Sequence, residues 1–273
     1  MPKTRVTKER YSRVRFSRHL IAFFLASCFV LAAQPRSVRL ADLTWKEAAE
    51  ALTPRTIVMI PLGAASKEHG PHLKLSNDFV MAEYLANEAM SRTSVVVAPT
   101  ITYNYYPAFV DYPGATSLRL ETARDLVVDI CRDLARFGPH RFYVLNTGVS
   151  TLRPLAQAAE QLARDGIVMR YTDILHASRE VEDQVRQEKE GTHADEIETS
   201  MMLYIAPQSV DMKKATRDFP VGSPLQWRDP NAPGYSPSGI FGDATLATRA
   251  KGEKIVRAQV EFIVKEIDGM RDK

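Results

Sequence analysis

The sequence predicts an α/β fold of three layers, with a mostly parallel central sheet and helices on both of its faces. Four apolar runs, at 56–64, 94–101, 141–146 and 167–172, alternate with stretches of helical periodicity. Such alternation is typical of a parallel sheet whose right-handed crossover helices cover both sides. The first two runs are almost continuously apolar and do not alternate with polar residues, as expected for strands that are buried on both faces.

Helical periodicity follows the strands in order along the chain. The first helix is predicted at 79–90, after Asn77 and Asp78, either of which can cap it. The second is predicted at 121–137, where Gly138 ends it, and the third at 152–164. A charged helix is predicted at 173–190, and the second half of the segment 191–207 is helical and apolar. A long loop rich in Pro, Gly and Ser follows at 219–240, and the last helix is predicted at 247–270. Since no internal repeat or linker interrupts this order, we expect one domain.

The N-terminus has the order of a secretory signal peptide. Seven basic residues and one acidic residue occupy the first nineteen positions, and an apolar run at 20–33 follows. We therefore expect a signal peptide at 1–33, a mature domain at 34–273, and an exported protein that is periplasmic or secreted. The run is shorter than the roughly 20 apolar residues of a membrane span, so none is expected after leader cleavage. Two alternatives are a lipoprotein acylated at Cys28, which ends a lipobox-like LASC, and an uncleaved anchor.

The charge gives no indication of a nucleic-acid partner, and the cysteine content gives none of an internal disulfide. The formal net charge is +3, and the basic leader supplies most of that excess, so the remaining chain gives no case for a nucleic-acid partner. Cys28 and Cys131 are the two cysteines. Removal of the leader leaves Cys131, which lies in the apolar stripe of a predicted helix, so we expect a core residue and no internal disulfide.

Titratable side chains crowd the loop after the first strand. Its sequence, KEHGPHLKLSND, contains Glu68, His69, His72 and Asp78. Such side chains in a polar loop are often merely solvated. In an open parallel sheet, however, ligands bind beyond the carboxyl ends of the strands, which is where this loop lies. Clustered imidazoles and carboxylates are the ligands that zinc and manganese prefer, so the loop is a candidate metal site.

A second cluster, THADEIETS, contains His193, Asp195, Glu196 and Glu198. Asp195 and Glu196 suit the first turn of a helix on electrostatic grounds alone. Glu198 precedes the apolar stretch MMLYIA, which predicts a partly buried carboxylate that needs a metal or another cation as its partner. The two clusters together therefore define the candidate site.

These segments carry a resemblance to the creatininase family. PLG, then HGPHL, then Asp78 nine residues after His69 resemble the first signature of that family. HADEIETSMMLYIAP resembles the second signature, and YPGATSLRLET and FGDATLATRAKGEKI resemble two further family segments. The four motifs run in the family's order from about residue 56 to 255.

The resemblance implies a three-layer α/β domain that hydrolyses amide-like C–N bonds. It also implies a homo-oligomer, often a hexamer, and one or two divalent ions, zinc or manganese, with iron as an alternative. Carried over to this sequence, His69 and Asp78 match metal ligands, and Asp78 is the bridging carboxylate if two ions bind. His193 matches the histidine that handles protons, and Glu198 matches a ligand or an orienter of metal-bound water. Four further candidates for substrate contact are His72, Tyr105, Asn146 and Glu196.

Two positions depart from the family pattern. Lys67 stands where the family has a ligand glutamate; its neighbour Glu68 is the candidate replacement, although adjacent side chains of an extended segment point in opposite directions. Gly148 stands where the family has a ligand histidine. The open outcomes are one metal ion, no metal, or a rearranged pair that recruits His72, His176 or Asp173. Lys67 is either a surface lysine or a group that stabilises a developing oxyanion.

The preferred hypothesis is metal-dependent hydrolysis of a small-molecule amide or cyclic amide. Metal-activated water attacks the carbonyl, and His193 passes a proton to the departing nitrogen. The alternative is a non-catalytic exported binding protein that has lost the metal centre. A nucleotide-binding protein is the weakest hypothesis, because no glycine-rich phosphate loop follows any predicted strand.

Overall fold

The structure is a computed structural model that describes Pro2 and residues 37–271. The predicted signal peptide and Cys28 lie outside the described residues. Within the described part of the chain, none of the helices combines the length and apolar character needed to cross a membrane.

A five-stranded parallel sheet forms the centre of the domain. Its strands lie in the order β1-β3-β2-β4-β5, and every neighbouring pair is parallel. All six residues of the central strand β2 are buried, as the continuous apolar run predicts. The strands are β1 (Val38–Arg39), β2 (Ile57–Leu62), β3 (Val96–Val97), β4 (Arg141–Asn146) and β5 (Val168–Tyr171).

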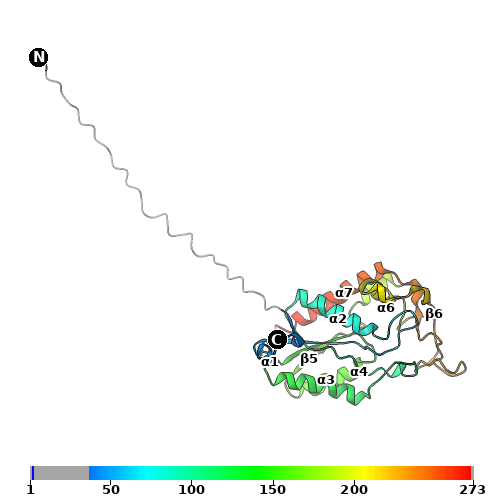
Figure 1. Cartoon of the computed structure of the whole chain (residues 1–273), viewed down its shortest axis with the longest axis horizontal. Coiled ribbons are helices and arrows are strands. Elements are labelled where there is room, and N and C mark those ends of the chain that lie inside the picture. The colour runs from blue at the N-terminus through cyan, green and yellow to red at the C-terminus, as the bar shows by residue number, and fades with distance from the viewer. Residues whose placement is uncertain (1, 3–36, 272–273) are drawn as a thin grey trace. The chain divides into compact units, whose positions relative to one another are not determined.

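Helices cover both faces of this sheet, which confirms the predicted three-layer α/β architecture (Figure 1). Alternate residues of β2 enter different cores: Ile57 and Met59 pack with α2, α6 and α7, whereas Val58 and Ile60 pack with α3 and α4. This division follows from the period of two residues along a strand. The helices are α1 (Trp45–Ala51), α2 (Asn77–Arg92), α3 (Leu120–Ala135), α4 (Leu152–Ala163), α5 (Arg179–Val185), α6 (Glu196–Ile205) and α7 (Arg249–Asp268).

Two predicted elements are shorter in the structure. The predicted strand at 94–101 pairs only at β3 and again at Ile101, because Pro99 has no N–H to donate between them. The charged helix predicted at 173–190 is reduced to α5. The Asp173 side chain accepts a hydrogen bond from the Leu175 N–H, and its carbonyl accepts from the N–H groups of His176 and Ala177, so the chain turns before the helix begins.

The loop at 219–240 is irregular, as predicted, and a short antiparallel pair flanks it. This pair joins β6 (Arg217–Asp218) to β7 (Gly242–Asp243). An isolated antiparallel bridge between His193 and Phe241 lies beside it. The end of the loop therefore holds the segment that enters α6.

The order of the strands locates a crevice. From β2 the chain passes to β3 on one side of it and then to β4 on its other side. The chain therefore diverges at the carboxyl ends of β2 and β4, the position where open α/β sheets bind ligands. Leu62 and Asn146, the last residues of the two strands, are paired in register there. The two loops that begin at Gly63 and Thr147 border this crevice.

Candidate metal centre

The loop from β2 to α2 brings His69 and Asp78 into contact. Gly63 allows the close approach, because a Cβ at that position would clash with the backbone carbonyl of Asp78 at the start of α2. The Nδ1 of His69 lies 2.9 Å from the carbonyl oxygen of Lys67, and its Nε2 lies 2.8 Å from Oδ1 of Asp78. A backbone carbonyl on one ring nitrogen fixes the orientation of the imidazole and directs the other nitrogen into the site.

Lys67 is buried in the same site and is not the surface lysine that the sequence left open. Its side chain is 7 % exposed, and its Nζ donates to Oδ2 of Asp78 at 2.8 Å. The same ammonium lies 5.1 Å from the ring centroid of Phe109 and 5.6 Å from that of Tyr106. Both distances are within the range of a cation–π contact.

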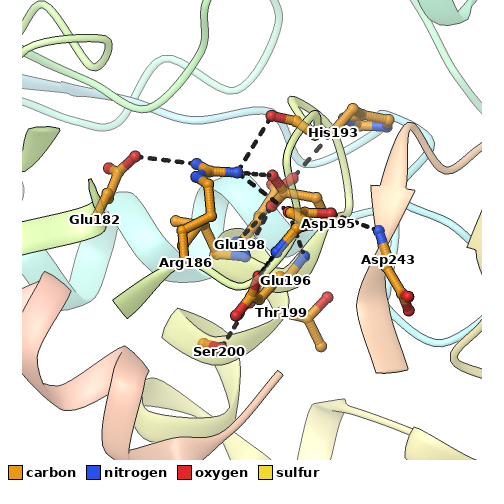
Figure 2. A network of polar contacts seen from close by, with 12 residues as sticks. Glu182, Arg186, His193, Asp195, Glu196, Glu198, Thr199, Ser200 and Asp243 are labelled. Carbon is orange, nitrogen blue, oxygen red and sulfur yellow. Dashed lines mark hydrogen bonds and ion pairs between the residues drawn. The ribbon is translucent and has the colours of Figure 1, made fainter. Parts of the chain in front are cut away.

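The first turn of α6 supplies Glu198. Asp195 caps this helix by accepting hydrogen bonds from the N–H groups of Ile197 and Glu198 (Figure 2). The Glu198 carboxylate has one hydrogen-bond donor on each oxygen. Oε2 accepts from the Ala194 N–H at 2.7 Å, and Oε1 accepts from Nδ2 of Asn77 at 3.0 Å. Its Oε1 also lies 3.3 Å from Nε2 of His69, so α6 and the β2 loop meet at this carboxylate.

His193 lies next to Glu198, just before α6. Its backbone pairs with Phe241, and its ring packs against Phe109 with centroids 4.1 Å apart. The Nε2 of His193 lies 2.9 Å from Oε2 of Glu68, while its Nδ1 lies 3.8 Å from Oε2 of Glu198. Glu68 therefore contacts His193 and points away from Asp78, as expected for adjacent residues of an extended loop.

These side chains fit a divalent cation. His69, His193 and Glu198 each offer one donor atom, and the three atoms lie within 4.8 Å of one another. Oδ1 of Asp78 contacts the same His69 nitrogen. Zinc binds imidazole and carboxylate at roughly 2.0–2.2 Å, and the edge of such a tetrahedron is about 3.4 Å. The separation of 3.3 Å between His69 Nε2 and Glu198 Oε1 is close to that edge.

Electrostatics hold the carboxylates of this site in their charged form. Burial alone would raise the pKa of Asp78, but the charges of His69 and Lys67 outweigh it and lower that pKa. The same balance of burial against His69, Lys67 and His193 holds the pKa of Glu198 well below its usual range. Ionised carboxylates are the form that binds a metal.

A cavity of about 190 Å³ opens onto the site. Its wall includes Lys67, His193 and Glu198, whereas His69 and Asp78 lie behind it and are almost fully buried. The loop between β3 and α3 contributes Tyr106 and Phe109, and the loop after β4 contributes residues 147–150. A metal at His69 and Glu198 would therefore lie at the base of a pocket that a small molecule can enter.

Other sequence candidates lie outside the cavity wall. Tyr105 is half-buried and does not line the cavity, whereas its neighbour Tyr106 does. Asn146 holds the turn after β4, where its Oδ1 accepts from the Gly148 N–H and the Thr151 hydroxyl. His72 is buried against the hydroxyl of Thr199, at 2.8 Å. His176 and Asp173, considered as substitute ligands, pair with each other; His176 is exposed and Asp173 is half-buried.

Glu196 belongs to a separate polar network beneath α6. Its fully buried carboxylate accepts hydrogen bonds from the N–H groups of Gln187 and Glu188 and pairs with Lys251 of α7. In the same network, Arg186 lies between Glu182 and Asp195 (Figure 2). The sequence did not indicate this network. The only available signal was the density of acidic residues before α6.

Comparison with known proteins identifies the family. The family model described as creatininase, creatinine amidohydrolase, matches residues 41–267, so the chain belongs to the creatininase family. The chain is therefore a hydrolase of that family, with a candidate His/His/Glu metal site.

Characterised relatives act on different substrates. The chain is 28 % identical to creatinine amidohydrolase of Pseudomonas putida, over 85 % of this chain and 96 % of the relative. It is 24 % identical to 3-dehydro-scyllo-inosose hydrolase of Thermotoga maritima, over 85 % and 83 %. It is 27 % identical to the mycofactocin precursor peptide peptidase of Mycobacterium ulcerans, over 77 % and 84 %.

Solved creatininase structures share the fold. A mutant creatininase complexed with creatine aligns with a TM-score of 0.72 at 25 % identity, over 86 % of this chain and 99 % of the other. A manganese creatininase aligns at 0.71 and 25 % identity, over 87 % and 100 %. A mutant creatininase of the Zn-Zn type aligns at 0.71 and 26 % identity, over 87 % and 99 %.

Proposed function

We propose that this protein is a metal-dependent hydrolase that cleaves an amide-type C–N bond of a small molecule. The observation that carries the proposal is the convergence of His69, Asp78 and Glu198 at the base of a cavity. Imidazole and carboxylate donors suit zinc or manganese, the metals of two solved relatives. When bound, such an ion lowers the pKa of a water molecule and polarises a carbonyl group.

His193 is the proton carrier in this proposal. Glu68 accepts a hydrogen bond from its Nε2–H, which leaves Nδ1 on the side of Glu198 and the cavity. A carboxylate on the far nitrogen fixes the tautomer and stabilises the imidazolium form, as in other carboxylate–histidine pairs. His193 can then accept a proton from the attacking water and donate it to the departing nitrogen.

The size of the cavity favours a small substrate. Pockets for drug-sized ligands span about 300–1,000 Å³, whereas this cavity measures about 190 Å³. The relatives hydrolyse a cyclic amide, an inosose and a precursor peptide according to their names, so the family alone does not choose among them. We infer a compact amide or cyclic amide, whose carbonyl can approach the metal position beside Glu198 while its remaining atoms contact Tyr106 and Phe109.

One observation favours a second candidate function. Lys67 already pairs with Asp78, which would allow the domain to exist without a metal as a binding protein for small molecules. In that case no amide would be hydrolysed with or without metal, and chelation would leave the binding of small molecules unchanged.

Metal removal and return tests the proposed function. The full-length protein would be freed of metal by chelation, and hydrolysis would be followed by mass spectrometry, as addition of one water to cyclic amides and as cleavage of formamides, linear amides and short peptides. We expect turnover of at least one cyclic or linear amide after addition of zinc or manganese, loss with chelator, and loss in Asp78→Asn. The matched control is Asp133→Asn at an exposed aspartate of α3. Turnover that persists without metal, or its absence in all metal-loaded samples, would contradict the proposal.

A further inference from the structure

The two carboxylate oxygens of Asp78 have different partners. Oδ1 lies 2.8 Å from Nε2 of His69, on the side where Glu198 also approaches. Oδ2 lies 2.8 Å from the ammonium of Lys67. A carboxylate that bridges two metal ions in the common bidentate mode gives one oxygen to each ion. In this protein a positively charged side chain already occupies the position beside the second oxygen.

The surroundings of Lys67 hold its ammonium there. Its side chain is almost fully buried, and its ammonium lies over the rings of Tyr106 and Phe109 at cation–π distance. An ammonium with a buried carboxylate partner would leave that carboxylate uncompensated if it moved into solvent, which is costly.

The loop after β4 lines the same cavity as Lys67 and offers no side chain that commonly binds a divalent ion. Its residues 147–151 read TGVST, without a histidine or an acid. A Cβ at Gly148 would lie 3.0 Å from Oγ1 of Thr151 and 3.4 Å from the Tyr106 ring, so these neighbours crowd any larger side chain at this position. Lys67 and Gly148, the two departures from the family pattern, therefore both lie beside Tyr106 in the wall of one cavity.

We propose that Lys67 serves as the second cation of this centre, so that the protein binds a single divalent ion at His69, Asp78 and Glu198. The charges agree with this arrangement. The site contains three carboxylates, those of Glu68, Asp78 and Glu198. One lysine and one divalent ion neutralise them when the imidazoles are neutral, whereas two divalent ions beside Lys67 would leave an excess of positive charge. A solved relative, by contrast, is of the Zn-Zn type.

This inference rests on the proposed function, and metal stoichiometry tests it separately from activity. The metal-free full-length protein would be equilibrated by dialysis against zinc or manganese, and bound metal would be measured by mass spectrometry. We expect one ion per chain in the wild type. In Lys67→Glu and Lys67→Gln, which remove the positive charge and offer an oxygen, we expect a second, weaker equivalent. Manganese should then give an exchange-coupled electron paramagnetic resonance spectrum in place of the wild type's isolated-ion spectrum.

Lys74→Glu is the matched control, because Lys74 lies in the same loop and is exposed. It makes the same change of charge and should keep one equivalent. Two ions in the wild type would overturn the role of Lys67 and leave the proposed function intact. One ion in both Lys67 variants, folded by circular dichroism, would also overturn it. No bound ion in the wild type would instead refute the metal-dependent function itself.

Discussion

At the scale of single residues, Glu68 and His193 form a pair whose parts are 125 positions apart in the chain. Glu68 is held in place because its other oxygen accepts a hydrogen bond from the Gly70 N–H. Phe109 packs on the ring of His193 and restricts it further. The imidazole therefore presents one nitrogen to a buried carboxylate and the other to the cavity, which is the arrangement that a proton carrier needs.

His193→Ala should remove proton transfer while leaving the metal in place. We expect kcat to fall by about 10²- to 10⁴-fold, the usual contribution of a general acid or base. The bound metal should stay within error of the wild type, because His69, Asp78 and Glu198 remain. Steady-state kinetics and metal analysis on the same preparation check both parts.

The matched control for that substitution is His176→Ala, at an exposed histidine whose partner is Asp173. His193→Gln serves as a second variant, since its amide nitrogen can take the place of the histidine Nε2 and still donate to Glu68. Near-normal turnover in folded His193→Ala would remove this residue from the mechanism. Loss of the metal together with turnover would identify His193 as a ligand.

At the scale of elements, the sequence predicted what depends on local pattern. The bounds of β4 agree with the prediction, and β2, α2, α3, α4 and α7 lie within two residues of theirs, because apolar periodicity and caps act over a few neighbouring residues. α5 was predicted too long, because the turn at Asp173 depends on hydrogen bonds that periodicity does not encode. The short strand β1 and helix α1 were not predicted.

The residues of the candidate site could be predicted from the sequence, but most of their contacts could not. The sequence indicated His69, Asp78, His193 and Glu198 as a group, and the structure brings them together. It did not indicate that Lys67 points inward while Glu68 faces His193, because that depends on how the loop after β2 packs against α6. Pairings such as that of Glu196 with Lys251 also need tertiary structure, since the partners are 55 positions apart.

At the scale of the whole molecule, a buried acidic network ties the segment before α6 to the rest of the domain. Glu188 accepts hydrogen bonds from Arg186 and from the N–H groups of Glu196 and Asp243. Burial, followed by the neighbouring charge of Asp195, raises the pKa of Glu188 to about 8. The folded state therefore keeps a proton on Glu188 that the unfolded chain releases at lower pH.

This proton makes stability depend on pH. Because the folded pKa is raised, the contribution of Glu188 is fully present below its ordinary pKa of about 4.5 and is lost as the pH rises through about 8. Between those values one proton changes the free energy of unfolding by at most about 1.4 kcal/mol per pH unit.

Glu188→Gln should flatten that decline, because an amide can donate to Asp195 as the protonated acid does and does not titrate. Urea unfolding at pH 6 and pH 9 would show a smaller loss of stability in this variant than in the wild type. Glu190→Gln, at an exposed neighbour, should decline in parallel with the wild type. Equal slopes for all three proteins would refute a protonated Glu188.

The position of the metal tests most directly whether His69, Asp78 and Glu198 bind a single divalent ion. Crystals of the full-length protein grown with zinc or manganese would give an anomalous difference map at the absorption edge of that metal. We expect one peak at the crevice between β2 and β4, within about 2.0–2.2 Å of His69 Nε2 and of oxygens of Asp78 and Glu198. A metal-free crevice under saturating metal, or a peak bound by other residues, would contradict it.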